Sequence, residues 1–252
     1  MNYSIIKNRE ELEQFIEWLP DGKFYVSLYA RKKYNTPTSG TPGLKADKSQ
    51  LKRFVSDKKH LINKIEKLEV NKGLYTTDNG LVINEESLAM YITPNERNMH
   101  KAALKLSAEI TSKSADGFII DNPQALALNM IQKYGVEKYY DVDIDLTTEG
   151  LKADRNAIYN DLNEKVSDFV NMSAISVIQT HGGFHYLVNK NEVLPEFRKK
   201  WFMGFKNLKT ELFETTMNGD NQVPVPGCTQ GGKYPIMLKK RFTHHSVELI
   251  FN

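Results

Sequence analysis

The chain has 252 residues with 40% hydrophobic and 26% charged residues, which is ordinary for a soluble globular protein and allows one large domain or a domain with a substantial subdomain. The formal net charge of +3 is too weak to indicate a nucleic-acid partner by itself. The single cysteine, Cys228, excludes an internal disulfide and a cysteine-based zinc site, so we expect an intracellular, cytoplasmic protein without zinc.

The N-terminal segment lacks the apolar core of a signal peptide, and no apolar run approaches the length of a membrane span, so no membrane partner is expected. Residues 9–19 place apolar side chains at helical spacing, and Asn8 with Glu11 predicts a capping box at the start of this helix. Residues 23–30 predict a strand that ends in the basic cluster 31–34 (RKKY). This cluster could hold phosphate or a template strand, or it could be a solvated loop.

Residues 45–72 carry nine Lys or Arg against four Asp or Glu. Apolar residues within 48–70 fall near helical spacing, which predicts a long helix with a basic face. A solvated face is the default interpretation of such a charge run. Residues 88–92 predict a short strand, and residues 96–112 and 123–134 predict two helices.

The segment 141–145 (DVDID) alternates three carboxylates with two β-branched residues. Alternation with period two predicts a strand that places Asp141, Asp143 and Asp145 on one face and buries the residues between them. Carboxylates on one face repel each other, and a divalent cation such as Mg²⁺ or Mn²⁺, which prefers hard oxygen ligands, removes that repulsion. The segment therefore predicts either a metal platform for phosphoryl chemistry or an acidic, solvated strand face.

The elements that follow are a helix, two strands, a second helix and further strand character, at 154–171, 173–180, 184–188, 195–217, 234–238 and 247–251. With the acidic strand they form the order of the split βαβ unit, in which the first and third strands are neighbours. We therefore expect an α+β fold, with a ferredoxin-like (RRM-like) βαββαβ catalytic unit over 136–252. Residues 1–135 would form an N-terminal α/β subdomain with basic helices. His185, on the third strand, would lie beside the carboxylates.

The segment 180–185 (THGGFH) forms the predicted turn between two apolar strands. Glycines permit close approach of the backbone to a ligand, which applies to Gly182 and Gly183. His185 faces one side of its strand alone, and such a histidine is more often structural than functional. Beside an acidic metal strand, however, it could hydrogen-bond an incoming triphosphate. His181, in the turn itself, is more ambiguous.

The segment 218–220 (NGD) is followed by the glycine- and proline-rich run 224–232 (PVPGCTQGG). Asp220 could complete a carboxylate set for two metal ions, although an aspartate in a turn is very common and, taken alone, favours a structural role. The run after it could cradle a sugar or phosphate through its backbone N–H groups.

These three stretches, in this order, resemble the archaeo-eukaryotic primase superfamily, the primase–polymerases, in members of phage or mobile-element type. The family carries an Asp-hydrophobic-Asp motif at the end of a strand, which matches Asp143 and Asp145. Its second motif, a small or hydroxyl residue with glycines before a hydrophobic residue and histidine, matches Thr180 to His185. A third acidic residue lies further on, and Asp220 matches it more loosely. The basic cluster 31–34 is also similar to phage-type members.

The resemblance implies a DNA primase or primase–polymerase, a template-directed nucleotidyltransferase that initiates or extends strands by two-metal phosphoryl transfer with Mg²⁺ or Mn²⁺. The implied metal ligands are Asp143, Asp145 and Asp220, with Asp141 a weaker candidate. The implied nucleotide contacts are Thr180, His181, Gly182, Gly183 and His185, with help from Lys233 or Arg31. The implied partners are a single-stranded DNA template along 31–33 and 48–70, NTP or dNTP, and a separate replicative helicase. The location would be the cytoplasm, that of the host if the chain is phage-encoded.

Two other functions remain open on the residues alone. The same acids could serve a metal-dependent nuclease or a replication-initiator endonuclease, although His181 and His185 are four residues apart where paired-histidine initiators need His-hydrophobic-His. The unit could also be a non-catalytic nucleic-acid-binding module. Such modules carry stacked aromatic residues on their central strands, where this chain carries aspartates.

Overall fold

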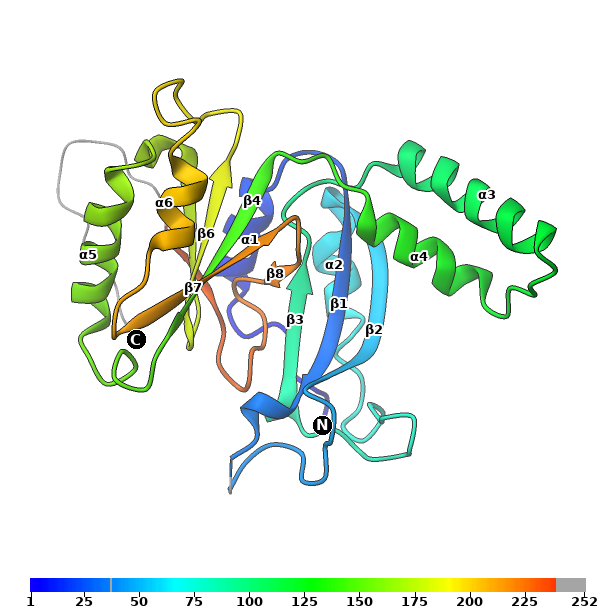
Figure 1. Cartoon of the computed structure of the whole chain (residues 1–252). Helices are drawn as coiled ribbons and strands as arrows, with labels where there is room; N and C mark the ends of the chain where they lie inside the picture. Colours follow the sequence, from blue (N-terminus) through cyan, green and yellow to red (C-terminus); the bar gives the residue numbers. More distant parts are fainter. Residues whose placement is uncertain (37, 239–252) are drawn as a thin grey trace. The chain divides into compact units, whose positions relative to one another are not determined.

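Two antiparallel sheets organise the protein, and the expected α+β class is confirmed (Figure 1). The computed structural model describes residues 1–36 and 38–238. The chain divides into two units, each with one sheet. Unit 1 comprises Met1–Glu137 and Gln222–Tyr234, and unit 2 comprises Lys138–Asn221 and the described residues 235–238. The segment 222–234, which we expected in the catalytic unit, therefore belongs to unit 1.

Unit 1 contains a four-stranded sheet in the order β2-β1-β3-β8. Its strands are β1 (Lys23–Arg31), β2 (Lys48–Asp57), β3 (Leu88–Ile92) and β8 (Val223–Pro224). Its first two helices are α1 (Arg9–Trp18) and α2 (Leu61–Glu66), and short 3₁₀ turns span Lys32–Tyr34, Lys58–His60 and Glu85–Ser87. The side chain of Asn8 caps α1 by accepting a hydrogen bond from the backbone N–H of Glu11 at 3.1 Å, as predicted.

The predicted helix over 48–70 is wrong. Residues 48–57 form β2, which pairs with β1 along its whole length, and only Leu61–Glu66 is an α-helix. A register shift in this ladder, between Leu28 and Tyr29 of β1, interrupts the alternation of side chains. Burial alternates between exposed and intermediate over residues 48–53, but most side chains there are polar, so the sequence lacks the apolar–polar alternation that would mark it as a strand.

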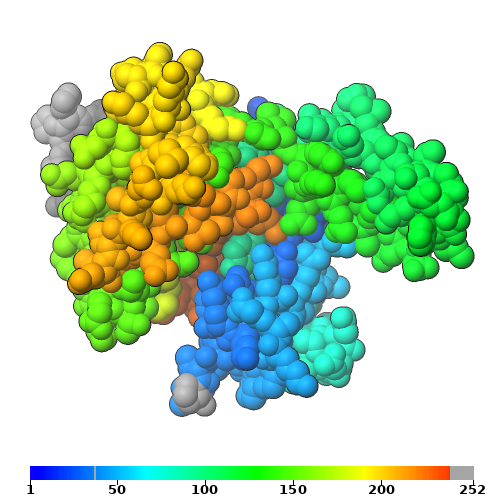
Figure 2. Space-filling view, viewed as in Figure 1, coloured from blue at the N-terminus to red at the C-terminus, as the bar shows by residue number. Residues whose placement is uncertain are grey.

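Helices α3 (Met99–Ala115) and α4 (Pro123–Lys133) confirm the two helices expected there. Asn98 and Asn122 cap them through their side chains, and Pro123 occupies the first turn of α4. The two helices pack against each other and stand away from the sheet of unit 1 (Figure 2). Only Ala102 is fully buried in the pair.

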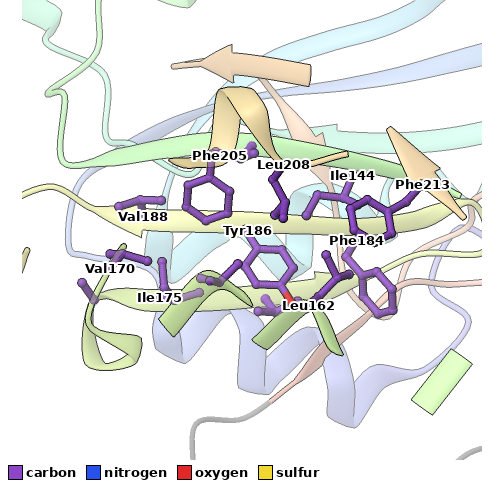
Figure 3. Packing of buried hydrophobic residues seen from close by; sticks show 14 of the residues in the cluster. Ile144, Leu162, Val170, Ile175, Phe184, Tyr186, Val188, Phe205, Leu208 and Phe213 are labelled. Atoms are coloured by element: carbon purple, nitrogen blue, oxygen red, sulfur yellow. The ribbon is translucent and has the colours of Figure 1, made fainter. Parts of the chain in front are cut away.

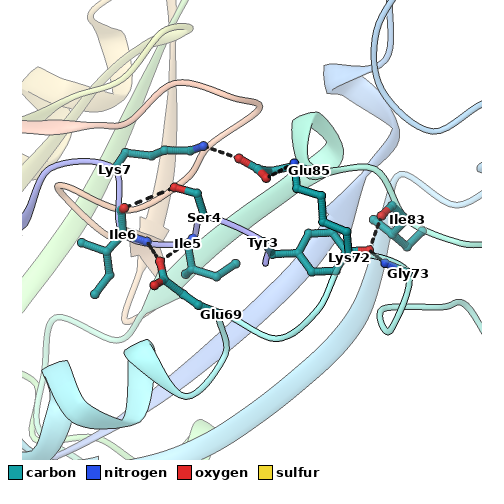
Figure 4. A network of polar contacts seen from close by, with 10 residues as sticks. All are labelled: Tyr3, Ser4, Ile5, Ile6, Lys7, Glu69, Lys72, Gly73, Ile83 and Glu85. Carbon is teal, nitrogen blue, oxygen red and sulfur yellow. Dashed lines mark hydrogen bonds and ion pairs between the residues drawn. The ribbon is translucent and has the colours of Figure 1, made fainter. Parts of the chain in front are cut away.

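Two glutamates fasten the N-terminal segment of unit 1 (Figure 4). One carboxylate oxygen of Glu69 accepts the backbone N–H groups of Ile5 and Ile6, each at 2.9 Å. Glu85 forms ion pairs with Lys7 and Lys72. Burial would raise the pKa of Glu85, but hydrogen bonds from the two lysines outweigh it and lower that pKa to about 2. The ionised carboxylate is therefore part of the fold at neutral pH.

Unit 2 contains a five-stranded antiparallel sheet in the order β7-β4-β6-β5-β9. Its elements are β4 (Tyr139–Leu146), α5 (Arg155–Ser167), a 3₁₀ turn (Met172–Ala174), β5 (Ile175–Gln179), β6 (Gly183–Asn189), α6 (Trp201–Asn207), β7 (Phe213–Gly219) and β9 (Ile236–Leu238). From β4 to β7 the order is strand, helix, strand, strand, helix, strand. The first and third strands, β4 and β6, are neighbours, as expected.

Both helices of unit 2 cover the same face of its sheet (Figure 3). The apolar residues of β4 and β6 that point to this face pack with residues of α5 and α6. The buried cluster includes Val142, Ile144, Phe184, Tyr186, Val188, Ile158, Leu162, Val166, Phe205 and Phe213. The opposite face of the sheet carries the polar residues of these strands together with the buried Leu187 and Ile178.

The predicted helix from Pro195 to about Met217 is wrong in its second half. Helix α6 covers only Trp201–Asn207, and Phe213–Gly219 forms β7 beside β4. The fourth strand of the expected unit is therefore β7, whereas β9 adds to the other edge of the sheet, beside β5. The strand expected at 247–251 lies outside the described residues. No helix among the described residues is long and apolar enough to cross a membrane.

Candidate active site

The three aspartates of β4 occupy the face of the sheet that the helices leave uncovered. Val142 and Ile144 are fully buried in the apolar cluster, so alternation turns Asp141, Asp143 and Asp145 the other way. Their accessibility rises along the strand. Asp141 is fully buried, the side chain of Asp143 is 25% exposed, and Asp145 is exposed. The row therefore runs from the interior to the surface.

His185 lies directly opposite Asp143 in the β4–β6 ladder. Its Nδ1 atom is 3.0 Å from an Asp141 carboxylate oxygen, and its Nε2 atom is 3.6 Å from an oxygen of Asp143. The imidazole is 7% exposed. The strand order thus brings the histidine between two of the carboxylates, which the sequence predicted from topology alone.

The charge of His185 follows from these neighbours. Burial alone would lower its pKa, but Asp141 and Asp143 favour the charged imidazole, and Asp145 adds to their effect. Together the carboxylates raise the pKa of His185 to about 9. At neutral pH the site therefore holds an imidazolium between carboxylates.

Asp141 serves as the support of this imidazole. One of its oxygens contacts His185 Nδ1, and the other accepts a hydrogen bond from the side-chain amide of Asn218 at 3.1 Å. With Nδ1–H donated to Asp141, the Nε2 end of the ring is directed to Asp143. Because both oxygens of Asp141 are engaged and buried, Asp143 and Asp145 are the members of the row that a ligand can reach.

The turn between β5 and β6 lies beside Asp145. Gly183 pairs with Asp145 in the ladder, and the Gly182 carbonyl accepts the backbone N–H of Leu146 at 2.8 Å. The hydroxyl of Thr180 accepts the Gly183 N–H at 3.1 Å and closes the turn. The predicted second motif is therefore adjacent to the acidic row, with the exposed His181 at its tip.

Arg155 fixes this turn from the start of α5, and sequence reasoning missed it. Its guanidinium donates hydrogen bonds to the carbonyl oxygens of Thr180 and His181, at 2.8 and 2.6 Å. A single arginine one residue inside a predicted helix carries no signal for such a role. Burial lowers its pKa.

Strand β7 borders the acidic row on its other side and adds residues that the sequence analysis also missed. Thr216 lies directly opposite Asp143, and Glu214 lies directly opposite Asp145. A fourth carboxylate therefore shares the acidic face. The alternation of apolar and polar residues in 213–219 (FETTMNG) is typical of a strand, but the segment was predicted to be helical.

Asp220 occupies a different place from Glu214. It follows Gly219, which pairs with Asp141 at the buried end of the row. At about 3.3 Å per residue, this end lies about 13 Å along the strand from Asp145. Asp220 is half-buried. Its role as a metal ligand stays a prediction.

The two cations predicted to assist nucleotide binding belong to unit 1. Arg31 donates hydrogen bonds to the Asp47 carboxylate at 3.0 Å and to the Tyr91 hydroxyl at 2.6 Å. Lys233 is exposed, in a short turn that pairs it with Gln230. Their roles in nucleotide binding stay predictions.

The accessible donors of the acidic face are Asp143, Asp145 and Glu214, which offer the hard oxygens that Mg²⁺ and Mn²⁺ prefer. Within residues 1–36 and 38–238, no three His, Cys, Asp or Glu side chains are already gathered as ligands around one point. The chemistry of the donor set fits a divalent cation, because Asp145 and Glu214 face each other with like charge. Binding would draw these accessible side chains together.

Comparison with known proteins leaves the function open. No family model, no curated protein and no solved structure matches the chain.

Proposed function

We propose that the protein is a metal-dependent nucleotidyltransferase, a primase–polymerase that joins nucleotides on a single-stranded DNA template. The observation that carries the proposal is the cross-strand register of β4 and β6, which sets His185 against Asp143 with Asp145 beside the glycine turn. The order of elements predicts this juxtaposition, and the residues that meet there are the ones that match the primase–polymerase motifs. The βαββαβ order of unit 2 supports the same fold family.

In this proposal, Asp143 and Asp145 would hold two divalent cations, with Glu214 or Asp220 as a further ligand. Such cations would lower the pKa of the primer 3′-hydroxyl and stabilise the charge that develops on the α-phosphate and the leaving group. The hydroxyl oxygen bonds to the α-phosphorus, the bond from that phosphorus to pyrophosphate breaks, and the hydroxyl proton passes to solvent water.

The protein's own groups bind and orient the nucleotide. Asp141 keeps the Nδ1–H of His185 engaged, so Nε2–H is the donor available to a phosphate oxygen of the triphosphate. The backbone of Gly182 and Gly183 can approach the nucleotide closely, and Arg155 holds that turn in place. Thr216 offers a hydroxyl beside Asp143.

The test is incorporation of labelled nucleotides on single-stranded template, with and without primer, in Mg²⁺ or Mn²⁺. Replacing Asp143 and Asp145 together by Ala should reduce incorporation at least about a thousandfold, since losing one transition-state-stabilising donor already costs about 10²–10³. The matched control is Glu164→Gln, which removes an exposed negative charge from α5, on the other side of the sheet. It should incorporate as the unmodified protein does.

Undiminished incorporation by the double variant would refute the assignment. Cleavage of single-stranded DNA in Mn²⁺ without nucleotides, and no incorporation with them, would favour the nuclease instead.

A second comparison identifies the third carboxylate. Glu214→Gln should lower incorporation more than Asp220→Asn does, because Glu214 is directly opposite Asp145. A larger loss of incorporation in Asp220→Asn than in Glu214→Gln would identify Asp220 as the third metal ligand.

A further inference from the structure

The loop between α3 and α4, at the far end of this helix pair, presents two adjacent apolar side chains to solvent (Figure 1). Phe118 is 67% exposed and Ile119 is 87% exposed. Asp116 precedes the pair and Asp121 follows it, and both are exposed. Neither carboxylate forms an ion pair within the described part of the chain. We call residues 116–121 the hairpin tip, an apolar knob between two negative charges.

Backbone hydrogen bonds hold the hairpin tip in one conformation. The Phe118 N–H donates to the Lys113 carbonyl at 2.8 Å. The Gly117 N–H donates to the Ser114 carbonyl at 3.1 Å, and Gly117 has a φ of +78°. These two bonds and the left-handed glycine define a Schellman motif at the end of α3. The residue at the Phe118 position of this motif usually packs on an apolar side chain at the Lys113 position, so the lysine leaves the aromatic ring exposed.

A surface of opposite charge lies on α6 in unit 2. Phe202 is 38% exposed and Met203 is 48% exposed. Backbone hydrogen bonds continue from the turns over 195–200 into α6, so residues three and four apart are neighbours along this stretch. Lys199 therefore lies one turn before the apolar pair, and Lys206 lies one turn after it. We call these four residues the α6 patch.

Other rings support the α6 patch, and other cations extend it. The ring centre of Phe202 lies 5.8 Å from that of Tyr140 and 5.7 Å from that of Trp201, both in edge-to-face contact. Tyr140 and Trp201 pack against the apolar cluster of unit 2. Arg198 and Lys200 are exposed and add positive charge beside the patch. The patch, like the hairpin tip, is therefore a supported surface with one sign of charge.

We propose that the hairpin tip of one copy of the protein docks on the α6 patch of a second copy. Each surface has two adjacent apolar side chains between two charged groups, which are carboxylates on the tip and ammonium groups on the patch, and such complementarity selects the partner. An anionic membrane surface would instead repel the carboxylates of the tip. Because few side chains meet, we expect association in the micromolar range or weaker.

The test is sedimentation velocity of the full chain over a range of protein concentrations. The mean mass should rise with concentration, and it should rise less at high salt, which screens the charges. Phe118→Ser combined with Ile119→Ser should raise the dissociation constant at least about tenfold, since truncating a buried aromatic anchor commonly costs that much. The matched control is Leu104→Ser, which removes a side chain of α3 that is 59% exposed. It should associate as the unmodified protein does.

Charge reversal tests the pairing of the two surfaces. Asp116→Lys with Asp121→Lys makes the hairpin tip as positive as the α6 patch. Lys199→Glu, Lys200→Glu and Lys206→Glu together make the patch as negative as the tip. Each variant alone should stay monomeric where the unmodified protein associates. An equimolar mixture of the two should form complexes that contain both, because every tip then meets a patch of opposite charge.

A mean mass that does not change with concentration in the unmodified protein would overturn the proposal. Undiminished association of the Phe118 and Ile119 double variant, or a mixture of charge-reversed variants that stays monomeric, would contradict it equally. If the double variant loses binding to vesicles of neutral phosphatidylcholine while its self-association is unchanged, the tip contacts lipid and the proposal fails. None of these measurements depends on the proposed catalytic activity.

Discussion

Side chains of like charge face each other directly across neighbouring strands in both sheets. Asp145 opposes Glu214 in unit 2, and Arg31 opposes Lys48 in unit 1. Such pairs oppose folding by up to about 1 kcal/mol, less where solvent screens them. In unit 1 the Asp47 carboxylate offsets this repulsion by pairing with Arg31. In unit 2 the repulsion between Asp145 and Glu214 is consistent with a ligand of opposite charge, a metal ion. Residues that serve ligands commonly lower stability in this way.

The free energy of unfolding should distinguish the carboxylates proposed to bind metal from Asp141, which supports His185. Glu214→Gln removes repulsion with Asp145 and should stabilise the metal-free protein by a few tenths of a kcal/mol. Asp141→Ala should destabilise it by about 3–5 kcal/mol, because the buried His185 imidazolium and the Asn218 amide lose their acceptor. Urea unfolding in EDTA measures both changes.

Asp143→Asn provides the comparison within the same row, since its side chain is partly exposed. It should destabilise the protein less than Asp141→Ala does, because it removes only the longer ion pair with His185 and leaves the buried contact with Asp141 in place. A loss of stability from Glu214→Gln, or tolerance of Asp141→Ala, would contradict the division of roles between these carboxylates.

At the scale of elements, the close approach of β4 and β6 depends on one glycine. A Cβ atom at Gly183 would lie 1.9 Å from the carbonyl oxygen of Ile144, so an alanine there must push the two strands apart. A Cβ atom at Gly182 would come no closer than 3.9 Å, to an Asp145 carboxylate oxygen. The two neighbouring glycines therefore offer a matched pair of substitutions.

Gly183→Ala should destabilise the protein by about 3 kcal/mol or more and abolish nucleotide incorporation, because overpacking of this size displaces backbone. Gly182→Ala should unfold at a similar urea concentration to the unmodified protein. Equal stability of the two variants would show that β4 and β6 can separate at little cost.

The elements show where sequence patterns suffice. The alternation in 141–145 identified β4 because one face is buried and the other carries charge. Strand β2 gave no such alternation, since it lies at the edge of its sheet and contains a register shift. The residues of β7 do alternate between apolar and polar, but the helix predicted over 195–217 included most of them, so the strand was not predicted. A local sequence pattern does not show whether a neighbouring strand is available to form backbone hydrogen bonds with the segment.

At the scale of the molecule, the chain returns to unit 1 after completing most of unit 2. Val223, Val225 and Cys228 are buried there, and strand β8 closes the sheet beside β3. The Thr229 carbonyl accepts the backbone N–H of Met90 at 3.0 Å. Unit 1 is therefore built from two separate segments.

A fragment of residues 1–137 should lack cooperative unfolding, because it loses three buried apolar side chains that contribute about 1.5–3 kcal/mol each, comparable with the stability of a domain. Joining residues 222–234 to it through a flexible linker should restore a cooperative transition, measured by circular dichroism. A cooperative transition in the short fragment would show that the returning segment is dispensable.

The sequence by itself determined the α+β class, the acidic strand and its buried alternate face, because a period of two is a local property of the chain. It also determined the proximity of Asp143 and His185, since the order of elements restricts which strands can be neighbours. Only the tertiary structure placed Glu214 opposite Asp145, engaged both oxygens of Asp141, and returned 222–234 to unit 1. These features depend on pairings between distant segments, whose free energy no local pattern contains.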